Sequence, residues 1–133
     1  MYLLDTNILL ELLLDQEKAD QVERFLRRLS PHRLYFSECA LYSLGIVLLR
    51  RCYYDVFLRA VEDLFVTGGM ELVQLGIEDM QDIVGAARKF KLDFDDAYQY
   101  VTAEKYHLTI VSFDSDFDRT ERGRQTPAQI EAA

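Results

Sequence analysis

Short apolar runs separated by small polar residues mark the beginning of the chain. Residues 1–4 are apolar, an Asp-Thr-Asn triplet at 5–7 interrupts them, and a second apolar run follows at 8–14. Asp, Thr and Asn are favoured at helix N-caps, because their side chains accept hydrogen bonds from the first free backbone amides. The pattern therefore predicts a strand that leads directly into a helix. Residues 18–29 then place apolar side chains on one face of a second helix.

The same alternation of strand-like and helix-like segments continues along the chain. Further strands are predicted at residues 33–36, 71–75 and 108–113, and further helices at 39–49, 53–65, 77–90 and 92–106. Parallel strands need a helical crossover between them, so this order predicts a three-layer α/β domain. We expect a mostly parallel central sheet that is flanked by helices.

The size and composition of the chain allow one folded domain. The chain has 133 residues, of which 50% are hydrophobic and 12% aromatic, and this excludes a disordered protein. We expect the domain to occupy residues 1–118. Residues 119–133 are polar and contain Pro127, and we expect them to form a poorly ordered or partner-bound tail.

The apolar runs and the cysteines indicate an intracellular protein. No run reaches the roughly 18 apolar residues of a membrane-spanning helix, and the first run is too short for a signal peptide. We therefore expect a cytoplasmic protein that does not enter the membrane. Cys39 and Cys52 lack Cys or His partners at zinc-ligand spacing, so we interpret both as reduced residues that pack in helices.

The charge balance is acidic, with 15 Lys and Arg residues against 23 Asp and Glu residues and a net charge of -8. A protein that holds nucleic acid mainly through basic side chains needs the opposite sign, so a simple DNA-binding module is disfavoured. A metal-dependent nuclease is compatible with this charge, because the acids that bind its cations add to the negative total.

Four acids stand where the predicted elements meet one edge of the sheet. Asp5 follows the first strand, Glu38 the second and Asp114 the last, whereas Asp96 lies in the first turn of the helix over 92–106. The carboxyl ends of parallel strands share one edge, so these side chains are expected to face one cleft. Two carboxylates about 4 Å apart repel by roughly 4 kcal/mol at an effective dielectric of 20, and bound cations remove this repulsion. Oxygen ligands of this kind favour Mg²⁺ or Mn²⁺.

Each of the four acids also has a purely structural interpretation. Asp5 can act as a helix N-cap, Glu38 can match a helix dipole, Asp96 can form a capping box with Asp93, and Asp114 can be a loop acid. Only their coincidence at strand ends points to a metal site. We interpret the two histidines as residues of solvent-facing turns: His32 and His107. Four aromatic residues are interpreted as part of the core or its rim: Tyr98, Tyr100, Phe113 and Phe117.

Three motifs in the sequence resemble those of the PIN domain family, and in particular its VapC-like members. They are the opening Leu-Leu-Asp-Thr-Asn-Ile-Leu-Leu-Glu, the Asp-Asp-Ala triplet at 95–97, and the closing Ile-Val-Ser-Phe-Asp-Ser-Asp-Phe at 110–117. The resemblance covers residues 1–118 and implies a Rossmann-like sheet with an acidic pocket for Mg²⁺ or Mn²⁺. It assigns the pocket acids and their polar support to Asp5, Glu38, Asp96 and Asp114, and to Thr6, Asn7 and Ser112.

The resemblance leaves some assignments open within these motifs. Asp95 is an alternative to Asp96, and Asp116 or Asp118 can supply a further ligand. Ser112 stands where the family usually has Thr, a difference that keeps the hydroxyl group.

The resemblance and the acids together predict a metal-dependent endoribonuclease of single-stranded RNA, acting as the toxin of a VapBC-type toxin–antitoxin pair. A metal-activated water attacks phosphorus in line in this mechanism, which leaves 5′-phosphate and 3′-hydroxyl ends. The expected partners are RNA, an antitoxin protein and a second copy of the chain. We expect self-association or a protein partner to use the apolar faces of helices 39–49 and 53–65. Six basic residues are candidates to guide the RNA backbone: Arg88, Lys89, Lys91, Arg119, Arg122 and Arg124.

Three other functions are considered for this sequence. A catalytically silent PIN-like binding module would keep the fold without the chemistry, and a housekeeping RNA-processing nuclease would keep the chemistry without an antitoxin. A response-regulator receiver is disfavoured, because it needs an Asp after a central strand and a Lys after a late one. Here the strand over 71–75 ends in Gly76, and the last strand ends in Ser-Phe-Asp.

Overall fold

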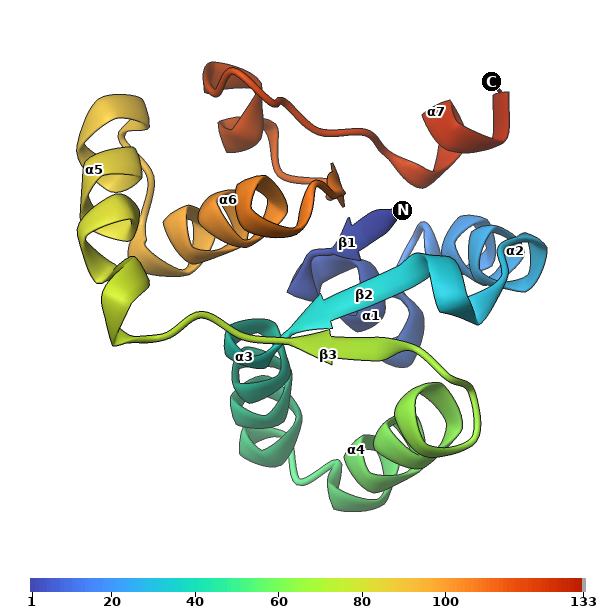
Figure 1. Cartoon of the computed structure of the whole chain (residues 1–133). Coiled ribbons are helices and arrows are strands. Elements are labelled where there is room, and N and C mark those ends of the chain that lie inside the picture. Colours follow the sequence, from blue (N-terminus) through green and yellow to red (C-terminus); the bar gives the residue numbers. More distant parts are fainter. Residues whose placement is uncertain (133) are drawn as a thin grey trace.

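Four short strands lie side by side in one parallel sheet in the computed structural model, which describes residues 1–132 (Figure 1). Their order across the sheet is β3-β2-β1-β4, so the first strand lies in the middle, between the second and the last. Leu3 of β1 is aligned with Tyr35 on one side and with Ile110 on the other. The strands are β1 (Tyr2–Leu4), β2 (Leu34–Ser37), β3 (Glu71–Val73) and β4 (Thr109–Val111).

Helices cover both faces of this sheet. Alternation along β1 sends Leu3 to a hydrophobic cluster with α5 and α6, and sends Leu4 to a cluster with α1, α2 and α3. The sheet is therefore the middle layer of three. The α-helices are α1 (Thr6–Leu13), α2 (Ala19–Arg28), α3 (Glu38–Arg50), α4 (Tyr54–Val61), α5 (Met80–Phe90), α6 (Phe94–Tyr106) and α7 (Pro127–Ala132).

Shorter helical turns connect several of these elements. A π-helical segment continues α4 directly, and single 3-10 turns precede β2, precede α5 and follow β4. They span Glu62–Val66, Pro31–Arg33, Ile77–Asp79 and Ser115–Arg119, respectively.

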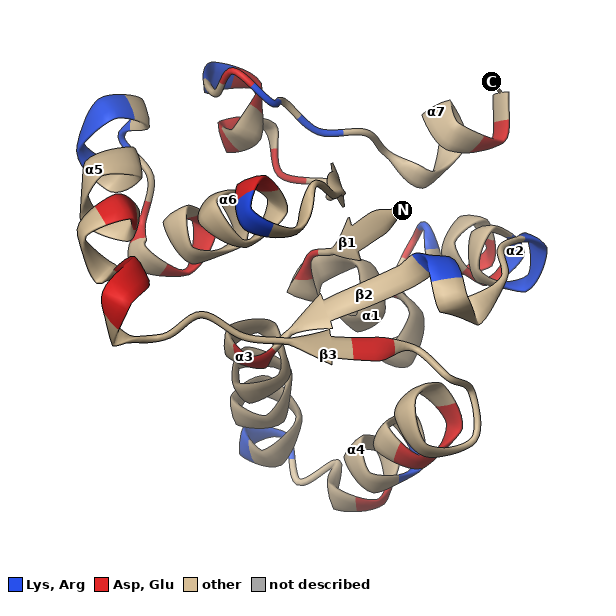
Figure 2. Ribbon diagram, in the orientation of Figure 1, with Lys and Arg blue, Asp and Glu red and all other residues tan. Residues whose placement is uncertain are grey.

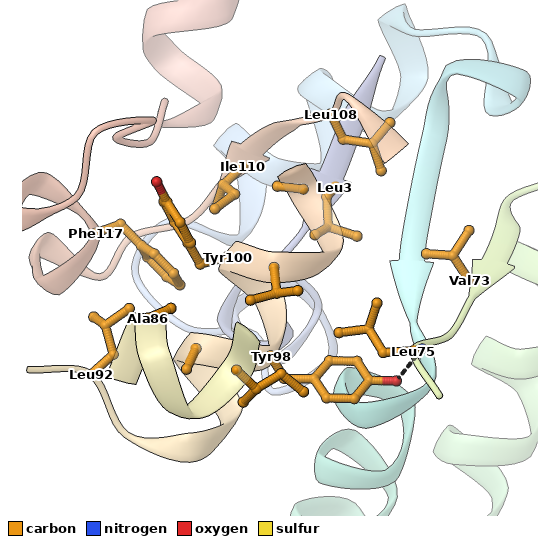
Figure 3. Close-up of a cluster of buried hydrophobic side chains, with 14 residues drawn as sticks. Leu3, Val73, Leu75, Ala86, Leu92, Tyr98, Tyr100, Leu108, Ile110 and Phe117 are labelled. Carbon is orange, nitrogen blue, oxygen red and sulfur yellow. Dashed lines mark hydrogen bonds between the residues drawn. The ribbon is translucent and has the colours of Figure 1, made fainter. Parts of the chain in front are cut away.

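The cluster beneath α5 and α6 is rich in aromatic side chains (Figure 3). Tyr98, Tyr100 and Phe117 are almost completely buried in it, which confirms their interpretation as core residues. The hydroxyl oxygen of Tyr98 accepts a hydrogen bond of 2.8 Å from the backbone amide of Leu75. This bond satisfies a buried donor just beyond β3, and it joins α6 to that end of the sheet.

The sequence prediction of a three-layer α/β domain is confirmed, and the sheet is parallel throughout. β2 is shifted by one residue, and the other strands are shorter than predicted, since β1 begins at Tyr2, β3 ends at Val73 and β4 ends at Val111. His32 and His107 are exposed at turns, as expected. Cys52 differs from the prediction, since it is exposed in the turn after α3 with φ of 61°, whereas Cys39 is half-buried; both are free thiols.

The segment after β4 lies against the domain, and this corrects the expectation of a poorly ordered tail. The amide of Gln125 donates to Ile110 O at 2.8 Å, and Gln125 O accepts from the amide of Ser112 at 3.0 Å. Arg124 holds Asp118 through two nitrogen atoms and also donates to Ser112 O at 3.2 Å. Ile130 of α7 packs against the cluster on the α1–α2 side of the sheet. The segment thus covers the outer edge of β4.

Within residues 1–132, no helix combines the length and the apolar character that crossing a membrane requires.

Candidate metal centre

The order of the strands creates a crevice at the carboxyl ends of β1 and β4. The chain leaves β1 toward β2 on one side, and it returns from β3 to β4 on the other side. Ligands of open α/β sheets bind at such a switch point. A cavity of about 270 Å³ lies here, lined by Asp5, Thr6, Asn7, Leu10, Cys39, Ala40, Ser43, Val47, Asp95, Asp96, Gln99 and Asp114.

Asp5 occupies the point where β1 passes into α1. Its amide donates to Val111 O at 2.9 Å, which ties it to the end of β4. Its Oδ1 accepts from the amide of Thr6 at 2.8 Å, so it is also the N-cap of α1. Its Oδ2 accepts from the hydroxyl of Ser112 at 2.7 Å. Asp5 thus caps α1 through Oδ1 while the same buried carboxylate lines the cavity. The N-cap and metal-site interpretations of Asp5 are therefore compatible.

Ser112 and Asn7 connect the two strand ends. Ser112 Oγ accepts from Asn7 Nδ2 at 3.1 Å and from the amide of Asp114 at 2.9 Å. Asn7 Oδ1 accepts from the amide of Phe113 at 3.3 Å, so both ends of the Asn7 amide group are used. The loop after β4 is thus fixed to the start of α1. Thr6 extends the network to α3, through a long bond of 3.4 Å from its hydroxyl to Ala40 O.

Three carboxylates meet at the mouth of the crevice. Oxygen atoms of Asp96, Asp114 and Asp116 lie within 4.8 Å of one another. Asp96 comes from the first turn of α6, whereas Asp114 and Asp116 belong to the turn after β4. Asp114 Oδ1 accepts from the amide of Asp116 at 2.8 Å, which keeps these two side chains in place.

Burial and nearby negative charges raise the pKa values of two acids in this cavity, Asp96 and Asp5. The pKa of Asp96 rises from 3.8 to about 7, mainly by burial and then by the negative charges of Asp5, Asp95, Asp114 and Asp116. Burial also raises the pKa of Asp5, and Asp114 adds to this effect, whereas hydrogen bonds to Asp5 act in the opposite direction. The metal-free cavity therefore favours protonation of a carboxyl group near neutral pH.

Sequence and structure comparisons identify the family of this domain. Residues 2–123 match the model of the PIN domain. The chain belongs to the PIN domain family. A comparison with curated proteins finds no match.

Solved structures of toxins and of toxin–antitoxin complexes share the fold of this chain at low sequence identity. The toxin VapC20 of Mycobacterium tuberculosis, described as cleaving the sarcin–ricin loop, is 18% identical, with a TM-score of 0.75 over 89% of this chain and 93% of VapC20. A chain of a toxin–antitoxin complex from Klebsiella pneumoniae is 22% identical, with a TM-score of 0.73 over 96% of this chain and 98% of that one. VapBC2 from Rickettsia felis, bound to a promoter DNA fragment, is 14% identical, with a TM-score of 0.68 over 93% and 96%.

The donor set of the cavity fits the divalent metal ions that PIN domains use. Carboxylate oxygens dominate it, and hard cations such as Mg²⁺ and Mn²⁺ prefer oxygen ligands. Neighbouring negative charges contribute to the raised pKa of Asp96, so the Arg119–Asp116 pair does not cancel the repulsion within the cluster. A divalent cation would reduce this repulsion, so the residues present suit the ion.

Glu38 is the sequence-predicted acid that the structure does not place in this cavity. The side of α3 that faces the cavity carries Cys39, Ser43 and Val47, which follow each other at intervals of four residues. Glu38 begins the adjacent stripe instead, and its Oε1 accepts from the hydroxyl of Tyr42 at 2.8 Å. The phase of α3, set by the packing of Ala40, Leu44 and Leu48, therefore turns Glu38 away from Asp5, Asp96 and Asp114.

Two polar residues of the cavity, Ser43 and Gln99, were not predicted from the sequence. Gln99 lies three residues after Asp96 on α6, a spacing that places both side chains on one helix face. This three-residue spacing from Asp96 could have identified Gln99 as a cavity residue from the sequence. Asp95, predicted as an alternative to Asp96, lines the cavity together with it.

Most of the basic residues predicted to guide RNA are engaged within the protein. Figure 2 marks the positions of Lys and Arg along the ribbon. Lys89 pairs with Glu121 at 2.8 Å, and Arg119 pairs with Asp116 at 3.0 Å. Arg122 donates to Leu108 O, and Arg124 binds Asp118. Arg88 and Lys91 form no salt bridge within the described residues and stay candidates for RNA contacts. The pairing of Asp118 with Arg124 also removes Asp118 from the metal cluster.

Proposed function

We propose that this PIN domain is a metal-dependent endoribonuclease that cuts single-stranded RNA in the cytoplasm, as the toxin of a VapBC-type pair. The observation that carries the proposal is the position of Asp5, Asp96 and Asp114 in one cavity at the switch point of the sheet. A silent binding module would have no need to keep three mutually repelling carboxylates, two of them buried, in one place. The likeness in fold to a toxin described as an RNA-cleaving enzyme supports the same function.

The side chains divide into those that hold Mg²⁺ or Mn²⁺ and those that orient these ligands. Asp5, Asp96 and Asp114 bind the cation, and Asp116 is close enough to Asp96 and Asp114 to join them. A cation held by these residues would supply the activation of water and the stabilisation of negative charge that phosphodiester hydrolysis needs. Ser112 orients Asp5 through its hydroxyl, and Asn7 in turn holds Ser112. Thr6 supports Asp5 through its backbone amide, and its hydroxyl links the start of α1 to α3.

Partner binding is proposed to use an exposed groove between α3 and α4. This α3–α4 apolar groove has a volume of about 680 Å³ and is lined by Leu41, Tyr42, Gly45, Ile46, Leu49, Arg50 and Phe57. Tyr42 and Ile46 are each more than half exposed, which is unusual for neighbouring large apolar side chains. We propose that a second copy of the chain covers this groove. An antitoxin protein is the second proposed partner, as the Klebsiella pneumoniae and Rickettsia felis complexes contain such pairs.

The test of the nuclease is a matched pair of preparations, wild type and Asp114→Asn. Wild type is expected to cut single-stranded RNA with Mg²⁺ or Mn²⁺, to stop in EDTA and to leave 5′-phosphate ends. Asp114→Asn is expected to reduce the rate at least about 100-fold, because loss of a ligand misplaces the ion that carries the chemistry. Asp118→Asn is the control, since Asp118 pairs with Arg124 outside the cluster.

Contaminating ribonucleases are recognised by the products. Metal-free ribonucleases leave 2′,3′-cyclic phosphates and survive EDTA. Equal cleavage by wild type and Asp114→Asn, or cleavage that survives EDTA, would contradict the proposal and favour the silent binding module.

A further inference from the structure

Gln99 is a buried polar residue of the cavity whose hydrogen-bonding capacity is only half used. It lies in the middle of α6, and only 3% of its surface is exposed. Its Nε2 donates to Asp5 Oδ1 over a long distance of 3.4 Å. Its Oε1 is buried and has no hydrogen-bond partner among the described residues.

The orientation of the Gln99 amide group follows from its surroundings. The ionised carboxylate of Asp5 accepts hydrogen bonds and cannot donate them. The amide nitrogen of Gln99 is therefore assigned to face Asp5 Oδ1, and the amide oxygen points elsewhere. The reverse orientation would place two acceptors against each other. The unpaired atom of Gln99 is therefore an oxygen, and it belongs to a side chain that lines the same cavity as Asp5 and Asp96.

An unpaired buried carbonyl oxygen is unfavourable in a protein interior, and most such atoms have a partner. A backbone or side-chain donor is not supplied here by the described residues. A divalent cation held by the neighbouring carboxylates would satisfy this oxygen, because Gln carbonyls are ordinary ligands of hard cations. A neutral oxygen also adds a ligand without adding repulsion to a cavity that already contains several acids.

We propose that Gln99 Oε1 is a neutral ligand of the divalent cation, and that Gln99 Nε2 positions Asp5 for the same ion. This inference rests on the proposed metal-dependent function. It gives the site an oxygen from α6 where the sequence had predicted a fourth carboxylate from Glu38. The cation would then be held by three segments: the β1–α1 junction, the first turns of α6, and the turn after β4.

The test measures Mn²⁺ affinity by titration calorimetry and by the electron paramagnetic resonance signal of free Mn²⁺, with no RNA present. Gln99→Leu keeps the approximate size of the side chain and removes both polar atoms. We expect it to weaken Mn²⁺ binding about 10-fold or more, in the range that loss of a supporting group at a metal site produces. We also expect the melting temperature of its metal-free form to be unchanged or higher, since an unpaired buried atom is removed.

A matched control comes from the same helix. Thr102 is fully buried, its hydroxyl donates to Tyr98 O at 2.7 Å, and it does not line the cavity. Thr102→Val therefore removes a buried polar group of α6 away from the ion, and its Mn²⁺ affinity is expected to equal that of wild type. Gln99→Glu restores an oxygen at the ligand position, so it is expected to bind Mn²⁺ at least as tightly as wild type.

The outcomes separate the role of Gln99 from the proposed function. Wild type that binds Mn²⁺ together with Gln99→Leu of equal affinity would overturn only the role of Gln99. Gln99→Glu that binds as weakly as Gln99→Leu would overturn it too, because the oxygen would then be irrelevant. A wild-type protein that binds no Mn²⁺ would contradict both the inference and the proposed nuclease.

Discussion

Ser112 shows, at the scale of one residue, how the site depends on a single hydroxyl group. The group donates to Asp5, and it accepts from Asn7 and from the amide of Asp114. Its one donor and two acceptor positions are all used, and the residue is completely buried. These bonds use the hydroxyl group alone, so a Thr at this position would offer the same donor and acceptors.

The metal dependence of stability should reside in Asp5. Mg²⁺ or Mn²⁺ is expected to raise the melting temperature of wild type, because an ion that binds only the native state stabilises it by mass action. Asp5→Asn should largely abolish this shift. It should also mildly stabilise the metal-free protein, because it removes a charge from the self-repelling cluster. The helix cap is kept, since Asn caps a helix about as well as Asp. Differential scanning fluorimetry with and without metal measures both effects. Asp15→Asn, a change of equal charge at an exposed turn, should keep the wild-type shift.

Asp96 should make the metal-free protein less stable as the pH rises. Its pKa is about 7 in the folded chain and about 3.8 in the unfolded chain, so between these values only the folded chain holds the proton. The folded state thus binds more protons, and the free energy of unfolding falls as the pH increases from about 4 to about 7. Urea titrations of metal-free wild type and Asp96→Asn across this range should show a decline that is smaller in the variant. Parallel pH profiles would contradict this assignment.

Individual elements depend on local caps, and α3 provides a clear case. Ser37 is completely buried at the end of β2, and its hydroxyl accepts from the amide of Ala40 at 3.0 Å. Ser37→Ala should reduce the free energy of unfolding by about 1 kcal/mol, the usual effect of losing an N-cap. Ser30 precedes a 3-10 turn but makes no capping bond, so Ser30→Ala should leave stability unchanged. Equal denaturation midpoints for the two variants would contradict the capping role of Ser37.

The order of elements could be predicted from the sequence, but the rotation of helices and the path of the tail could not. Asp5 and Asp114 were found because Asp5 directly follows β1 and Asp114 lies three residues after β4, and the direction of a strand fixes where its end lies. Glu38 was assigned without knowledge of which side of α3 faces the cavity, a choice made by packing against both neighbouring layers. The tail was misjudged because backbone bonds at Gln125 and the Arg124–Asp118 pair hold a polar segment that shows little hydrophobic pattern.

For the whole molecule, self-association through the α3–α4 apolar groove is expected. Ile46 is 53% exposed in this groove, and Gly45 lets the ring of Phe57 approach α3, because a Cβ there would lie 3.2 Å from Phe57 Cζ. Ile46→Asp should therefore shift the protein from dimer to monomer at tens of micromolar in light scattering. Ile77→Asp is the control, since Ile77 is 86% exposed outside the groove. A wild-type monomer at this concentration would contradict the proposed dimer.

The central position of β1 has a consequence for the time at which the protein becomes functional. β1 is synthesised early, but it is flanked by β2 and by β4, the most distant strand along the chain. The Ser112–Asp5 hydrogen bond spans 107 positions, and contacts of such separation form slowly because the intervening chain must first be ordered. Until β4 emerges from the ribosome, one edge of β1 stays open to other strands, and Asp5 has no Asp114 beside it. Nascent chains therefore carry an aggregation-prone edge before the proposed metal site can form, and the order of synthesis delays that site until β4 has been made.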